Sequence, residues 1–117
     1  MKYKDRDSIT ISGNLVSIQF SLPLGSHVKK IKGSILDNSV FSVCDGDTVV
    51  SGKITDGTDI YKPKVKISTF NQTTNPMEYH ISTDTNFHMK NGTFTFEFYT
   101  LISSYQGENE KMKVMYE

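Results

Sequence analysis

The strongest structural signal in the sequence is the stretch Phe87-His88-Met89-Lys90-Asn91-Gly92-Thr93-Phe94-Thr95-Phe96-Glu97-Phe98-Tyr99-Thr100-Leu101. Asn-Gly is the preferred pair for a two-residue type I′ turn, because both central residues of that turn need a positive φ. We therefore predict a β-hairpin closed by Asn91 and Gly92. In this register Met89 lies opposite Phe94, and Phe87 lies opposite Phe96.

The same register sorts the side chains by polarity, which supports the prediction. Met89, Phe94, Phe87, Phe96 and Phe98 share one face, and His88, Lys90, Thr93, Thr95 and Glu97 share the other. A slip of one residue would mix the two sets. The stretch therefore predicts two half-buried strands whose aromatic side chains contribute to a core.

Alternation of apolar and polar residues continues on both sides of this stretch, along most of the chain. Clear examples are Ile9 to Ile11, Val16 to Leu22, Val65 to Thr69 and Met112 to Tyr116. The adjacent Lys29 and Lys30 interrupt one such strand and predict a bulge. Asp, Asn, Gly and Pro residues separate the segments, as expected for turns.

This pattern predicts an all-β protein with about 8–10 short strands and no helix. We expect an antiparallel β-sandwich, jelly-roll-like or immunoglobulin-like, with a small β-barrel as the second choice. Residues 1–7 are charged and are expected to be a flexible N-terminal arm. Residues 8–117 are expected to be a single domain, with the C-terminal strand at a sheet edge, where it could pair with a neighbouring sheet.

Composition narrows the class of protein. The chain has no Ala and no Trp, and its 13 basic residues balance its 13 acidic ones. Without a basic excess we expect no nucleic-acid partner. Cys44 is the only cysteine, so no internal disulfide forms. No signal peptide or membrane-spanning segment is evident, so we expect no membrane partner and a location in a virion if the protein is viral, or otherwise in the cytoplasm.

Candidate chemical groups all have a simpler structural interpretation. Asp45-Gly46-Asp47 and Asp56-Gly57-Thr58-Asp59 could supply oxygen ligands to calcium, but Asp-Gly pairs are typical of turns. The histidines His27, His80 and His88 have unrelated spacing and are expected at the surface. Cys44 precedes two aspartates, which disfavour a reactive thiolate, so we expect a structural thiol. We therefore expect no metal, no cofactor and no catalytic residue.

Lysines form two clusters in the sequence that are candidates for binding a partner. Lys62, Lys64 and Lys66 alternate along one strand, and Lys29, Lys30 and Lys32 form a second group. Such lysines either cover a solvated sheet face or form a basic stripe that docks on an acidic protein or a glycan. Our candidate partner-binding residues are Lys62, Lys64, Lys66, Asn71, Gln72, Thr73, Asn75, Lys111, Lys113 and Tyr116.

Three classes of function fit these observations. The first is a structural or assembly protein that binds other protein subunits in many copies or as a homo-oligomer. The composition of this chain is typical of small accessory proteins of phage particles, such as capsid decoration, head-fibre or tail components. The alternative is a carbohydrate-binding module or lectin-like receptor-binding domain, for which Tyr61, Tyr99 and Tyr105 are the candidate aromatic residues. An enzyme is the third class, and we expect the protein not to be one.

Overall fold

The computed structural model describes residues 1–36, 48–71, 78–99 and 111–117. The described residues form ten strands, all in antiparallel pairs. Their bounds are β1 Lys2–Asp5, β2 Ser8–Ser12, β3 Leu15–Ser21, β4 His27–Leu36, β5 Thr48–Thr55, β6 Ile60–Tyr61, β7 Lys64–Asn71, β8 Glu78–His88, β9 Thr93–Tyr99 and β10 Lys111–Tyr116. The prediction of an all-β protein is confirmed.

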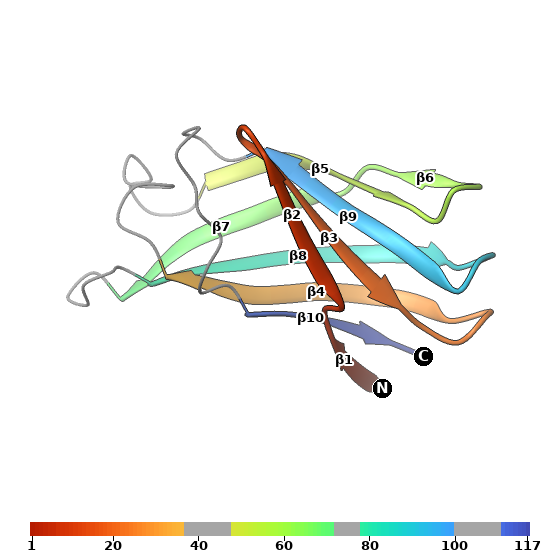
Figure 1. Ribbon diagram of the computed structural model, residues 1–117. Helices are drawn as coiled ribbons and strands as arrows, with labels where there is room; N and C mark the ends of the chain where they lie inside the picture. The colour runs from red at the N-terminus through yellow and green to blue at the C-terminus, as the bar shows by residue number, and fades with distance from the viewer. Residues whose placement is uncertain (37–47, 72–77, 100–110) are drawn as a thin grey trace.

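The strands form one strongly curled open sheet in the order β1-β10-β4-β8-β7-β5-β9-β3-β2, with β6 paired to β5 (Figure 1). In Figure 1, β7, β8, β4 and β10 run side by side, while β2, β3 and β9 cross them at an angle. The curl brings the two halves of the sheet face to face. The arrangement is therefore a half-barrel rather than a clear sandwich of two separate sheets.

Strand β5 joins the two halves of the sheet. Its first part, through Ser51, pairs with β7, and its second part, from Gly52, pairs with β9. A Cβ atom at Gly52 would lie 2.7 Å from Cγ2 of Val65, and the Gly52 N–H donates to the carbonyl of Pro63 at 2.9 Å. The close approach of the neighbouring strand explains why a residue without a side chain occupies the point where β5 changes partners.

The inner side of the curl is filled by one cluster of buried apolar residues. Val16, Ile18, Phe20, Phe94, Phe96 and Phe98 come from one half, and Val28, Ile31, Val65, Ile67, Tyr79, Ile81, Phe87, Met112 and Val114 from the other. The rings of Phe20 and Phe94 stack with centroids 5.2 Å apart. Among the residues predicted to face inward in these strands, the following are therefore buried: Val16, Ile18, Phe20, Val65, Ile67, Met112 and Val114.

The predicted hairpin at Asn91-Gly92 is wrong, although its inward face is right. β8 pairs with β4 and β7, whereas β9 pairs with β3 and β5. The turn crosses between the halves instead: the Met89 N–H donates to Ser26 O, and the Leu22 N–H donates to Gly92 O, each at 2.9 Å. Gly92 does not have the positive φ that a type I′ turn requires.

Two further expectations need correction at the ends of the chain. Within residues 1–7, Lys2–Asp5 forms β1, which pairs with β10, so this segment lies in the sheet rather than projecting as an arm. β10 in turn lies between β1 and β4 and is not an edge strand. Among the described strands, β1 and β2 stand at the two ends of the strand order, and they follow each other in the sequence. The predicted bulge near Lys29 is confirmed by the register shift between Val28 and Lys30.

Candidate functional site

The outer surface of the β7-β8-β4-β10 half carries the main concentration of charge. Lys66 lies opposite Ser82, Ser82 lies opposite Lys32, and Lys32 lies opposite Lys113, so these four residues form a row across the strands. Alternation places neighbouring lysines on the same outer side. We call the set Lys30, Lys32, Lys64, Lys66, Lys111 and Lys113 the lysine face.

Charge on the lysine face is only partly balanced by described residues. Lys30 has the Asp84 carboxylate at 3.6 Å, an exposed pair. Among the described residues, no acidic side chain forms an ion pair with Lys32 or Lys113, which lie directly opposite each other. Like charges at opposed positions destabilise a sheet. On its other side Lys113 lies opposite Asp5 of β1, whereas the residues opposite Lys32 are Lys113 and Ser82. The positive charge that an anionic group would neutralise is therefore centred on Lys32.

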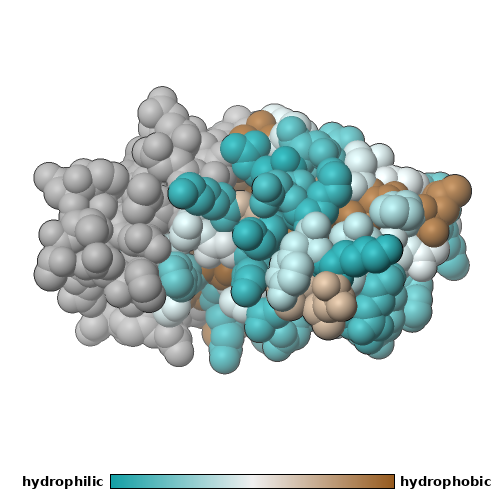
Figure 2. Space-filling view, turned by 90° about the horizontal axis from the view of Figure 1, so that it is seen from below, coloured by the Kyte–Doolittle hydropathy of each residue, from teal (hydrophilic) through white to brown (hydrophobic). Residues whose placement is uncertain are grey.

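Two shallow hollows indent this face. One, of about 440 Å³, is lined by Lys30, Lys32 and Ser34 of β4, by Lys111 and Lys113 of β10 on one side, and by His80 and Ser82 of β8 on the other. The other, of about 430 Å³, includes Lys62, Lys64, Lys66, Val49 and Asp84. Ser82 lines both, because this short side chain stands between long lysines. Figure 2, seen from the side of β1, β10 and β4, shows a mostly hydrophilic described surface.

The structure brings some of the predicted partner-binding residues together and separates others. Lys62, Lys64, Lys66, Lys111 and Lys113 all lie at the two hollows. Tyr116 instead packs against the apolar core. Asn71 ends β7, and Gln72, Thr73 and Asn75 lie outside the described residues. Lys30 and Lys32 belong to the site through the pairing of β4 with β10, a neighbour relation that spacing in the sequence does not reveal.

The tyrosines considered for sugar binding do not form one platform. Tyr61 lies opposite Ile54 and packs against the core, so it faces inward. Tyr99 is exposed at the end of β9, on the side away from the buried Phe98. Tyr105 lies outside the described residues. Tyr61 and Tyr99 thus face opposite sides of the sheet.

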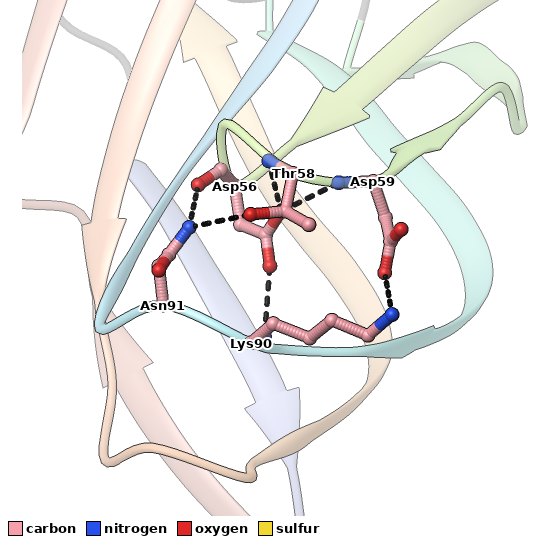
Figure 3. Close-up of polar contacts among 5 residues, drawn as sticks. All are labelled: Asp56, Thr58, Asp59, Lys90 and Asn91. Carbon is pink, nitrogen blue, oxygen red and sulfur yellow. Dashed lines mark hydrogen bonds and ion pairs between the residues drawn. The ribbon is translucent and has the colours of Figure 1, made fainter.

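A second polar cluster surrounds Asp56, one of the aspartates considered for calcium binding (Figure 3). Its carboxylate accepts hydrogen bonds from the backbone N–H groups of Thr58 and Asp59 at 2.9 Å and of Lys90 at 2.8 Å. The side chain of Asn91 donates to the Asp56 carbonyl at 2.6 Å. These contacts tie the turn after β5 to the turn after β8, which is a structural role.

The Asp56 carboxyl is buried, and its acidity reflects the balance of two effects. Burial raises its pKa, but the hydrogen bonds from the N–H groups of Asp59, Lys90 and Thr58 lower it, and the net result is a pKa of about 2. Lys90 Nζ forms a separate, exposed ion pair with Asp59 at 3.0 Å. The carboxylate of Asp56 is thus held ionised by backbone donors rather than by a cation.

The histidines occupy two places. His27 and His88 lie opposite each other on β4 and β8, with ring centroids 3.8 Å apart, and His80 lines the first hollow. No pattern in the sequence indicates that His27 and His88 stack, because strand register brings them together. Among the described residues, no three His, Cys, Asp or Glu side chains are grouped to hold a metal ion. Cys44 lies outside those residues.

No helix in the described part of the chain is long and apolar enough to cross a membrane. Comparison of the chain with protein-family models, with curated proteins and with solved structures found no match in any of the three.

Proposed function

We propose that this protein is a non-enzymatic structural or assembly protein that binds an acidic surface of other protein subunits through the lysine face. The observation that supports the proposal is the juxtaposition of Lys32 and Lys113, flanked by Lys30 and Lys111. Two cations held opposite each other repel, and an anionic partner relieves that repulsion. Binding of an acidic partner to the lysine face therefore requires no catalytic group.

The composition of the chain suggests the kind of assembly in which this binding occurs. A small, neutral chain rich in Ser and Thr, with one cysteine, is typical of accessory proteins of virus particles. We therefore propose a capsid decoration, head-fibre or tail component as the most suitable role. In such a particle each contact can be weak, since many copies act together.

Poly-L-glutamate serves as a protein-like acidic probe for the test. We expect the protein to bind it at low salt and to lose affinity as the salt concentration rises. The double variant Lys32→Glu/Lys113→Glu should bind at least about tenfold more weakly, because both centrally placed charges reverse. The control Lys2→Glu/Lys53→Glu changes net charge equally outside the lysine face and should keep nearly the wild-type affinity.

Heparin and a single-stranded DNA oligonucleotide are tested in the same binding assay, as anionic ligands of other chemical classes. Preferential binding of heparin would support the carbohydrate-binding alternative, and preferential binding of DNA would contradict the proposal. An equal loss of poly-glutamate binding in both double variants would show that total charge, rather than the lysine face, controls the interaction.

A further inference from the structure

The β2 edge of the sheet differs from the β1 edge in charge. β1 has the sequence Lys2-Tyr3-Lys4-Asp5, with three charged residues, whereas β2 has the sequence Ser8-Ile9-Thr10-Ile11-Ser12, with none. Charged residues on an edge strand discourage pairing with another sheet. The β1 edge carries that protection and the β2 edge lacks it.

Backbone groups along one side of β2 have no strand partner within the described ranges. β2 pairs with β3 from Ser8 to Ser12, and it ends the strand order there. An edge strand of this kind presents N–H and C=O groups to an incoming strand.

The sequence of β2 reads the same in both directions. If two copies of β2 pair antiparallel about Thr10, Ser8 lies opposite Ser12, Ile9 lies opposite Ile11, and Thr10 lies opposite Thr10. Like residues then meet on each side of the sheet, and Thr–Thr and apolar cross-strand pairs are favourable. A two-fold axis passes between the two Thr10 residues, as in an isologous dimer interface.

We propose that the β2 edge is a homodimerisation site, at which a second copy of this chain extends the sheet through antiparallel β2–β2 pairing. The exposed polar residues of β2, Ser8, Thr10 and Ser12, stay on the outer side, while Ile9 stays on the side that packs against the core. The pairing therefore needs no change in either copy. It goes beyond the proposed function, since β2 lies in the other half of the sheet from the lysine face.

The test is the mass of the protein measured by sedimentation equilibrium over a wide range of concentrations. We expect reversible association of the 13.2 kDa chain to twice that mass. Thr10→Lys places two cations opposite each other on the two-fold axis and should weaken the dimer at least about tenfold. Thr10→Glu should do the same with two anions.

Mixing the two variants distinguishes this pairing from other causes. An equimolar mixture of Thr10→Lys and Thr10→Glu should regain a dimer, seen by native mass spectrometry as a heterodimer, because opposite charges now face each other. The control Gln19→Lys adds a cation to the same outer side on β3, one strand inward, and should associate as the wild type does.

Three results would overturn the proposal: a wild-type protein that remains monomeric at millimolar concentration, a Thr10→Lys variant that associates normally, or a mixture that forms no heterodimer. None of these results bears on binding of poly-glutamate by the lysine face. The two proposals can therefore fail separately.

Discussion

The Asp56 carboxylate accepts the backbone N–H of Lys90 at 2.8 Å, and the two residues are 34 positions apart in the sequence. Asp56 follows β5, and Lys90 follows β8, so this hydrogen bond links turns that arise from different parts of the sheet. Because the carboxylate also accepts two N–H groups of its own turn, one side chain holds three donors in place.

Replacing Asp56 with Asn should lower the free energy of unfolding by about 2 kcal/mol, since hydrogen bonds to a charged acceptor are lost and an amide NH₂ opposes a backbone donor. Urea denaturation at neutral pH measures this. Asp59→Asn is the matched control: it removes only the exposed ion pair with Lys90 and should cost less than about 1 kcal/mol. Equal losses in the two variants would contradict the structural role of Asp56.

The same carboxylate predicts an acid-sensitive contribution to stability. The pKa of Asp56 is lowered from 3.8 to about 2 in the folded protein, so the folded state favours the ionised form. This contribution is complete above the unfolded pKa and is lost as pH falls from about 4 to 2. The stability difference between wild type and Asp56→Asn should therefore shrink over that interval, as measured by urea denaturation at each pH. A constant difference would refute the assignment.

Gly33 and Gly52 should differ in their tolerance of alanine. A Cβ atom at Gly33 would clash with the backbone carbonyl of Lys111 and with Met112 Sδ, whereas at Gly52 the nearest atom is a Val65 side-chain carbon. A side chain can move more readily than a paired strand, so Gly33→Ala should destabilise more, by about 3 kcal/mol or above, with Gly52→Ala nearer 1–3. Thermal and urea unfolding would reveal a reversed order if this reasoning fails.

Phe94 tests whether the two halves of the sheet share one core. It stacks on Phe20 in its own half and meets Phe87 of the other half edge-on, with centroids 6.3 Å apart. Phe94→Ala should cost about 3–5 kcal/mol by leaving a cavity. Tyr99→Ala, at an exposed position of the same strand, should change stability by less than about 0.5 kcal/mol. A small effect of Phe94→Ala in urea denaturation would argue against the shared core.

The sequence predicted the inward residues better than it predicted their partners. Alternation identified Val16, Ile18 and Phe20 as buried, because the two-residue period of a strand is a local property. The Asn91-Gly92 hairpin failed because a turn that crosses between two facing halves buries Phe87 and Phe94 just as well as a hairpin does. Local pattern therefore specified the side that faces the core but not the neighbouring strand.

The lysine face illustrates the same limit for the candidate site. Lys62, Lys64 and Lys66 were recognised as an alternating run and Lys29, Lys30 and Lys32 as a second group, yet Lys32 and Lys113 are neighbours only because β10 pairs with β4. That pairing joins strands that are far apart in the sequence, which no local pattern reveals. Likewise, the turn at Asp56 was predicted, while its contact with Lys90 required the positions of both halves.

The pairing of β1 with β10 has a consequence for protein synthesis. Lys4 lies opposite Val114, so β1, which precedes the other described strands in the chain, has as its ladder partner β10, which follows all of them. Contacts between such distant parts of a chain close slowly. We therefore expect β1 to stay unpaired on the nascent chain until β10 has emerged, so that the pairing of β1 is among the last steps in the formation of the sheet.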